Sequence, residues 1–153
     1  MPIYQAPRED IRFLLHEVLD AAQLAQLPDY GDANLETVDT VVDAAGQLCE
    51  QVLFPLNQSG DEEGCHFDNG VVTTPKGFKE AYQTFREGGW GGLSCDPAYG
   101  GQGLPLFLAA SVQQLVDSAC AAARSTTPRG PNSSEANAPA VSVCTFRASR
   151  AAR

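Results

Sequence analysis

The sequence predicts an all-α fold with one short hairpin-like insertion and a disordered tail. Apolar residues recur at helical spacing in four separate segments. Glycine and proline gather mainly between these segments. The composition then changes abruptly after residue 123. At 153 residues and 43% hydrophobic content the chain can form about one globular domain. We therefore expect a helical domain over 1–123 and a tail over 124–153.

The first predicted helix carries a single apolar stripe. Its members fall at positions i, i+3, i+4, i+7 and i+8: Ile11, Leu14, Leu15, Val18 and Leu19. Acidic residues at 9 and 10 suit the first turn, where the helix dipole favours negative charge. A short turn of helix is expected over 21–27, before Pro28.

A second, longer helix is expected to begin after Asn34, which has the side chain of an N-cap. Its stripe is Leu35, Val38, Val41, Val42, Ala45, Leu48, Cys49 and Val52. Gly46 inside it costs about 1 kcal/mol relative to alanine. Pro55 should kink or end the helix, which makes 58–64 a polar loop.

Residues 65–74 predict two short extended pieces around an Asn69-Gly70 turn. Thr74 and Pro75 then have the residue types of an N-cap and a first helical position. The third helix has the stripe Phe78, Ala81, Tyr82 and Phe85. The glycine pair at 88–89 should end it.

The stretch PAYGGQGLP (97–105) admits two interpretations, a phosphate-binding loop or a turn that leads into a helix. A dinucleotide-binding loop needs G-x-G-x-x-G between a strand and a helix. Here Gly101 and Gly103 match, Leu106 replaces the third glycine, and no hydrophobic strand precedes the loop. The turn is favoured, with a fourth helix from Leu106 to about residue 123.

Other polar clusters are better explained as solvated surface than as sites. His16-Glu17 starts an H-E-x-x-H pattern, but the fifth residue is Asp20. The acidic run 61–63 lacks the spacing of a calcium loop. No serine or cysteine has the context of a catalytic nucleophile. We therefore expect no self-contained active site, no catalytic or cofactor-binding residues and no metal site in this chain.

Charge and hydropathy exclude two classes of partner. Residues 1–123 have a balance of -13, although the whole chain is at -9, so nucleic-acid binding is not expected. No apolar run has the length of a membrane span. The N-terminus has charges where a signal peptide needs an apolar stretch, which predicts a cytoplasmic protein.

The tail has a balance of +4 and contains no Leu, Ile, Met, Tyr, Trp or Lys. Such a composition buries too little apolar surface to offset the entropy of ordering, so we expect disorder. Its Arg, Ala, Ser and Pro residues are typical of GC-rich DNA read out of frame. We therefore hypothesise a frameshift or a truncated gene model.

Three stretches together resemble the N-terminal part of the acyl-CoA dehydrogenases. They are MPIYQAPREDIRFLLHEVLD, LFPLNQSGDEEGCHFDNGVVTTPKGFKEAYQTFREGGWGGL and PAYGGQGLP. The resemblance covers about 1–118 and points to a bacterial branch with an N-terminal extension, which includes enzymes similar to 3-methylmercaptopropionyl-CoA dehydrogenase. It implies an N-terminal helical domain that is followed, in the family, by a β domain and a second helical domain.

The resemblance also implies a function in fatty acid metabolism. Enzymes of this family are FAD flavoproteins, usually homo-oligomers, in which a carboxylate removes the α proton of an acyl-CoA and the flavin accepts a β hydride. Electrons then pass to an electron-transferring flavoprotein. The helix after the glycine turn supplies one wall of the acyl pocket, which on this chain suggests Leu108, Val112 and Leu115. Core packing is the alternative role for these three residues.

Two departures from the family limit what this chain can do. The family often has an acidic residue near Gln113-Gln114, where this chain has two amides. The flavin-binding β domain and the catalytic base of the family have no counterpart here. We therefore expect this chain to be a fragment of a dehydrogenase. By itself the fragment is expected to be inactive and to hold no FAD. The alternative is a free-standing helical module that binds a partner or an acyl chain without redox chemistry.

Overall fold

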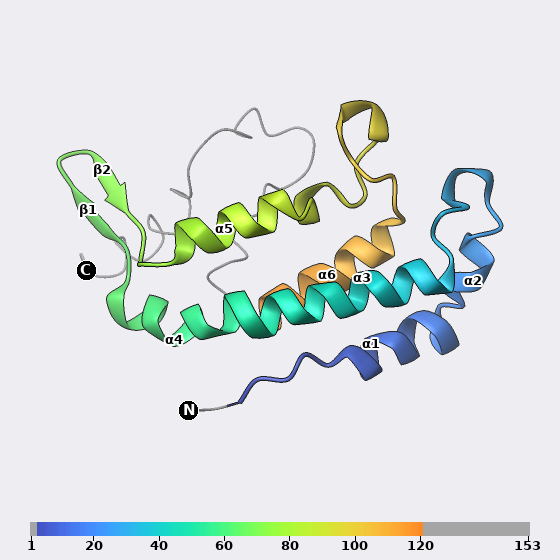
Figure 1. Ribbon diagram of the computed structural model, residues 1–153, viewed down its shortest axis with the longest axis horizontal. Coiled ribbons are helices and arrows are strands. Elements are labelled where there is room, and N and C mark those ends of the chain that lie inside the picture. The colour runs from blue at the N-terminus through green and yellow to red at the C-terminus, as the bar shows by residue number, and fades with distance from the viewer. Residues whose placement is uncertain (1–2, 121–153) are drawn as a thin grey trace, which may run out of the picture.

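The computed structural model describes residues 3–120, which form helices and a single hairpin (Figure 1). The elements are α1 (Arg8–Phe13), α2 (Ala21–Leu24), α3 (Leu35–Leu48), α4 (Phe54–Glu63), β1 (His66–Asp68), β2 (Val71–Thr73), α5 (Phe78–Glu87) and α6 (Leu106–Ala119). The predicted all-α class with a hairpin insertion is thus confirmed for this part of the chain. The expected tail, 124–153, lies outside the described residues, as does the predicted end of the fourth helix.

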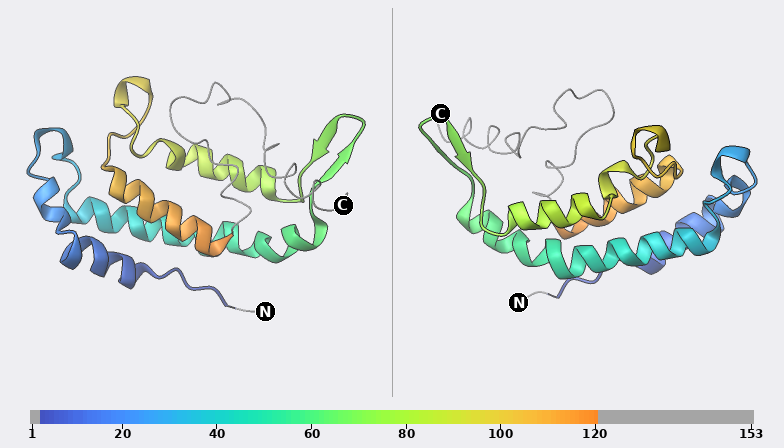
Figure 2. Two further views of the ribbon diagram at one scale, coloured as in Figure 1. Left: turned by 180° about the vertical axis from the view of Figure 1, so that it is seen from behind. Right: turned by 45° about the horizontal axis from the view of Figure 1, so that its top comes forward.

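Helix α3 is the centre of the structure (Figures 1 and 2). Helix α6 packs along one side of it and α1 along another. Helix α5 lies across the bundle from α1 and follows the hairpin, which projects from one end. The largest fully buried side chains come from α3, α6 and the turns next to α1 and α3: Leu15, Val38, Val42, Cys49, Leu108, Leu115, Val116 and Cys120.

The predicted stripe of the first helix is divided by a π-helical turn. Helix α1 ends at Phe13, and Leu14–Val18 form a turn with five-residue hydrogen-bond spacing. Ile11 and Leu15 are buried, but the rest of the stripe is exposed: Leu14, Val18 and Leu19. The prediction of one continuous stripe was therefore wrong, because the extra residue in the π turn rotates later side chains away from the core. The expected short helix over 21–27 is present as α2, which ends at Leu24.

Asn34 caps α3 as predicted, since its side-chain oxygen accepts a hydrogen bond from the Thr37 amide at 2.9 Å. Pro55 does not end the helix. A π turn over Cys49–Leu53 joins α3 to α4, and the Phe54 N–H donates to the Cys49 carbonyl across five residues. The hydrogen-bond ladder is therefore already shifted where proline lacks its N–H.

The polar loop expected over 58–64 is consequently wrong, because α4 continues to Glu63. Gly60 lets this helix approach α5 closely, since a Cβ at that position would overlap the ring of Phe78. Gly64 then stops the helix with a positive φ of 65°.

The hairpin is confirmed, with the pairs His66↔Thr73, Phe67↔Val72 and Asp68↔Val71. Asn69 and Gly70 both have positive φ, 49° and 83°, as the tight turns that match strand twist require. The start of the next helix was predicted too early. Lys76 and Gly77 form a turn after Thr74 and Pro75, Gly77 adopts a φ of 84°, and α5 begins only at Phe78.

Helix α5 buries Ala81 and Phe85, with Phe78 packed against the same core. Gly88 and Gly89 end it as expected, and Gly89 adopts a φ of 70°. The connection that follows contains Trp90 and leads to the glycine-rich stretch before α6.

Candidate functional site at the glycine turn and helix α6

The glycine-rich stretch folds back on the residues just before it. The amides of Gly101, Gln102 and Gly103 donate to the carbonyls of Asp96, Gly92 and Cys95 at 3.1, 3.0 and 2.9 Å. The next amide, of Leu104, donates to the Leu93 carbonyl at 2.8 Å. The turn is therefore closed by its own backbone.

At two positions in this turn the backbone requires glycine. Gly103 has a positive φ of 65°. A Cβ on Gly101 would overlap the backbone carbonyl of Cys95, which cannot move aside as a flexible side chain could. Asp96 begins the turn, since its carboxylate accepts from the Ala98 amide at 2.8 Å. Because the backbone N–H groups of 101–104 are already bonded, the turn does not offer the free donors that bind a phosphate.

The turn delivers α6, which begins directly after Pro105. Leu93 and Leu104 anchor its start and are both nearly buried, at 3% and 8% exposure. The structure therefore supports the second interpretation of the glycine stretch, a turn into a helix.

Leu108, Val112 and Leu115 share one face of α6, as their spacing predicts. All three are buried in the core, at 0%, 2% and 0% exposure, and α6 makes its contacts with α3 and with the π turn that follows α3. Leu106, on another face, is 73% exposed. Core packing, the alternative considered for the three residues, agrees with this burial.

The two amides after Val112 differ in their surroundings. The Gln113 side-chain amide donates to the Asp117 carboxylate at 2.9 Å, one helical turn later, while Gln114 is exposed. A carboxylate is thus present on this helix one turn beyond the position where the resemblance suggested one.

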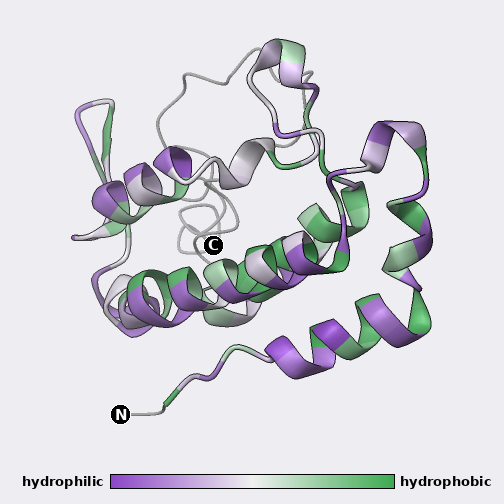
Figure 3. Cartoon of the chain, turned by 45° about the vertical axis from the view of Figure 1, so that its right-hand side comes forward, coloured by the Kyte–Doolittle hydropathy of each residue, from purple (hydrophilic) through white to green (hydrophobic). Residues whose placement is uncertain are grey.

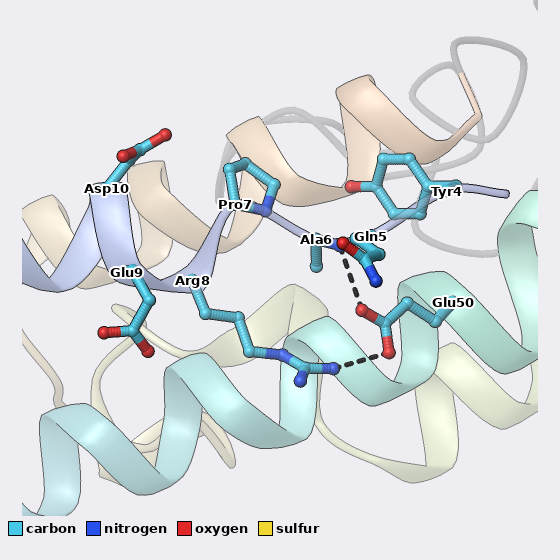
Figure 4. Close-up of a pocket in the computed structure, with 8 residues that line it drawn as sticks. All are labelled: Tyr4, Gln5, Ala6, Pro7, Arg8, Glu9, Asp10 and Glu50. Carbon is cyan, nitrogen blue, oxygen red and sulfur yellow. Dashed lines mark hydrogen bonds and ion pairs between the residues drawn. The ribbon is translucent and has the colours of Figure 1, made fainter.

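A hollow of about 490 Å³ lies where the N-terminal segment crosses α3 (Figure 4). It is lined by Tyr4, Gln5, Ala6, Pro7, Arg8, Glu9, Asp10 and Glu50. The Glu50 carboxylate accepts from the Ala6 amide at 2.9 Å and from the Arg8 guanidinium at 2.7 Å (Figure 4). Three of the lining side chains carry carboxylates, so the hollow is a poor site for the phosphates of coenzyme A or FAD.

Tyr4 fixes the beginning of this segment. Its ring stacks on Phe54 with centroids 5.2 Å apart, and its hydroxyl hydrogen-bonds Ser118 Oγ of α6 at 2.5 Å. Burial raises the pKa of the Tyr4 phenol, although the hydrogen bond to Ser118 acts in the opposite direction.

Further along α1, charged side chains pair with α3. The Arg12 guanidinium lies 2.6 Å from the Asp43 carboxylate and 3.3 Å from that of Asp39. His16 hydrogen-bonds Asp39 at 3.0 Å. Burial acts to lower the pKa of Arg12, but Asp43 and the neighbouring carboxylates outweigh it and the pKa is raised.

The sequence interpretation missed this interface. His16 was assigned to a solvated face, yet its side chain is only 24% exposed. The signal was present, since three basic side chains fall at i, i+4 and i+8 and two of their acidic partners at i and i+4: Arg8, Arg12, His16, Asp39 and Asp43. These contacts bind α1 to α3.

Within residues 3–120, no group of three or more His, Cys, Asp or Glu side chains is arranged to hold a metal ion. The acidic run 61–63 forms the last turn of α4, and Glu63 accepts from the Lys76 amide at 3.1 Å. Over the same range, the helices fall short of the length and apolar character that crossing a membrane requires.

No family model matches the chain. Among curated proteins, it is 35% identical over 116 residues to 3-methylmercaptopropionyl-CoA dehydrogenase of Ruegeria pomeroyi, which covers 76% of this chain and 20% of that protein. It is also 33% identical to butyryl-CoA dehydrogenase of Syntrophomonas wolfei, with 73% and 19% covered. The predicted resemblance to acyl-CoA dehydrogenases is confirmed, and the chain spans about a fifth of the length of these relatives.

Proposed function

We propose that this chain is the N-terminal helical domain of a flavin-dependent acyl-CoA dehydrogenase and that it does not catalyse the reaction by itself. The parent enzyme would oxidise an acyl-CoA thioester to its 2,3-enoyl form. The observation that carries the proposal is the similarity to two acyl-CoA dehydrogenases over three quarters of this chain but only a fifth of theirs.

The chemistry of the described residues supports inactivity. Transition-state stabilisation needs several groups placed together around the reacting atoms. The glycine turn uses its own amides, and the hollow beside Glu50 is acidic. Neither fits the pyrophosphate of FAD, so we assign the flavin of the parent to other parts of that enzyme.

An exposed apolar face supports the idea that another domain covers this one. Phe13, Leu14, Val18 and Leu19 are 44–60% exposed on α1 and the turn after it. Figure 3 shows hydrophobic residues along this turn and into α2. Exposed apolar side chains that gather in one segment are typical of interfaces and promote association when uncovered.

Helix α6 is proposed as one wall of the acyl pocket. Leu108, Val112 and Leu115 are buried, so we propose that they set the position of this wall by holding α6 against α3. Acyl-CoA and an electron-transferring flavoprotein would be partners of the parent enzyme, which we propose to be a homo-oligomer in the cytoplasm.

The direct test is to purify the full chain and record its flavin absorbance with and without added FAD. Butyryl-CoA and 3-methylmercaptopropionyl-CoA then serve as substrates, with the Ruegeria pomeroyi enzyme as positive control. We expect colourless protein and no acyl-CoA-dependent bleaching. Bound flavin with substrate-dependent bleaching would overturn the proposed inactivity. Colourless protein that folds cooperatively as a stable monomer would favour the helical-module alternative.

A graft tests the assignment to the family directly. Residues 1–118 replace the matching segment of the Ruegeria pomeroyi enzyme, and the chimera is assayed for flavin content and activity. Retained flavin and activity are expected if the segment is an equivalent domain. Leu108→Ala in the active chimera should raise KM for acyl-CoA more than Leu106→Ala, its exposed counterpart. A well-folded chimera with flavin but no activity would contradict the proposal.

A further inference from the structure

The N-terminal segment, residues 3–18, runs along one side of the bundle (Figure 1). Its apolar contacts with the core are those of Tyr4, Ala6, Ile11 and Leu15. In α1 and its π turn, only Ile11 and Leu15 are buried. Phe13, Leu14 and Val18 of the same segment are exposed. Hydrophobic burial therefore contributes less to this contact than to the contact between α3 and α6.

Beside the Tyr4 ring on Phe54 and the Tyr4 hydroxyl on Ser118, charge pairs provide the remaining contact. Arg8 bonds Glu50, and Arg12 bridges Asp39 and Asp43, with nitrogen–oxygen distances of 2.6–3.3 Å. Residues 1–123 contain 18 acidic and only 5 basic side chains, and two of those five bases are Arg8 and Arg12. The segment thus places rare positive charges on the acidic surface of α3.

A glycine on α3 leaves space for the Arg8 side chain of this segment. Gly46 is buried inside the helix, and a Cβ there would overlap the Arg8 guanidinium. The glycine that weakens α3 by about 1 kcal/mol therefore makes room for the bond between Arg8 and Glu50.

A pivot follows the segment directly. Asp20 has φ 48° and ψ 60°, a left-handed conformation that costs a non-glycine residue about 1 kcal/mol. Leu19 ends the π turn with a bond from its amide to the Leu14 carbonyl, and α2 starts at Ala21. Relaxing Asp20 to an ordinary conformation would swing the preceding residues away from α3.

We propose that residues 3–18 form an ionic strap that opens about Asp20 while the rest of the bundle stays folded. Opening uncovers the end of α3 and the start of the π turn that follows it. That turn begins with Cys49, which is fully buried and within electrostatic reach of Arg8 and Tyr4 in the strap. Because charge pairs hold the strap, added salt and the loss of a paired charge both favour the open state.

Hydrogen exchange of the full chain, read by peptide, tests this without any variant. Amides of residues 9–18 should exchange at least about tenfold faster than those of α3 and α6, and added salt should widen the gap. Alkylation of Cys49 should follow the exchange of residues 9–18 in its salt dependence. Exchange of residues 9–18 together with α3, at one common rate and salt dependence, would overturn the proposal.

Arg12→Gln sharpens the result, with Arg86→Gln on the exposed side of α5 as the matched control. Arg12→Gln should raise exchange in residues 9–18 and Cys49 alkylation about fivefold, with α5 unchanged. Arg86→Gln should change neither. If Arg12→Gln unfolds the chain, Gly46→Ala replaces it, since it displaces Arg8 without removing a charge. A variant that accelerates exchange equally in all helices would contradict a local opening.

Discussion

Helix α3 contacts its two long-range neighbours in opposite ways. It contacts α6 within the apolar core, to which α3 contributes completely buried valine and alanine side chains such as Val42 and Ala45. Toward α1 it presents the carboxylates of Asp39 and Asp43, which pair with Arg12. One helix therefore carries an apolar contact and an ionic contact on different faces.

The apolar contact with α6 and the ionic contact with α1 differ in how much they stabilise the fold and in what they require. Full burial of a large aliphatic side chain stabilises a fold by about 1.5–3 kcal/mol and needs matched volume rather than a specific partner. A partly exposed ion pair contributes about 1 kcal/mol or less, but it fixes register and responds to salt. We infer that the α6 contact holds the domain together and that the α1 contact decides where the N-terminal segment lies.

The largest expected effect is on the apolar contact. Leu108→Ala should lower the free energy of unfolding by about 2–5 kcal/mol, because the fully buried side chain leaves a cavity against α3. Urea unfolding followed by circular dichroism measures the loss. Leu106→Ala, at an exposed position of the same helix, should stay within about 0.5 kcal/mol of wild type. Equal losses in both variants would remove the distinction between the two faces.

The next effect is a loss of stability at high pH, caused by the buried Cys49 thiol. Burial raises the pKa of the Cys49 thiol to about 12, above its ordinary value of 9.0. The folded state therefore keeps a proton that the unfolded state loses. Stability from this group is complete below pH 9 and falls as pH rises toward 12, by about 1.4 kcal/mol per pH unit.

Urea unfolding between pH 8 and about pH 10.5 measures this slope. Cys49→Ala should flatten it, while Val42→Ala, which leaves a cavity in the same helix without removing a thiol, should keep it. Tyr4 contributes in the same direction, because burial raises its pKa too. If the free energy of unfolding fell with the same slope in wild type and Cys49→Ala, the Cys49 thiol would ionise as readily in the folded protein as in the unfolded chain.

A smaller effect is expected for the ionic contact. Glu50→Gln should cost about 1 kcal/mol or less, since it removes the charge that the partly exposed Arg8 guanidinium faces at 2.7 Å. Thermal unfolding at low salt provides the measurement. Glu9→Gln is the control, because Glu9 pairs with Arg12 from a side chain that is 87% exposed. A larger cost for Glu9→Gln would place the important pairs on the outside of α1.

The smallest expected change in overall stability is for Gly46→Ala. Alanine gains about 1 kcal/mol of helix propensity in α3 but displaces the Arg8 side chain, so the free energy of unfolding should change by no more than about 0.5 kcal/mol. Trypsin cleavage after Arg8 and Arg12 should nevertheless become faster. Unchanged cleavage would mean that Arg8 contributes little to holding the segment.

Local signals in the sequence were sufficient for most elements. The Asn34 cap, the Asn69-Gly70 turn and the glycine pair at 88–89 were each predicted because one residue type suits one backbone conformation. Leu108, Val112 and Leu115 have the spacing of residues on one helix face, and all three are buried. Their contact with α3 depends on tertiary packing, which spacing alone does not reveal.

The errors occurred where long-range contacts or an altered helix override local rules. Pro55 predicted a helix end, but the π turn before it removes the conflict. The apolar residues of 14–19 have helical spacing, yet in the segment with the other π turn only Leu15 of these four is buried. Gly46 was recognised only as a cost, because its partner Arg8 is distant in sequence.

The π turn at Cys49–Leu53 also determines which changes in chain length α4 can accept. A π turn holds one residue more than the α-helical turn it replaces. Deleting one residue there would restore regular spacing but rotate everything beyond it by about 100° about the helix axis. Phe54 would then turn away from Tyr4, and Gly60 away from Phe78. The additional residue thus sets the rotation of α4 about its axis, so that Phe54 faces Tyr4 and Gly60 faces Phe78.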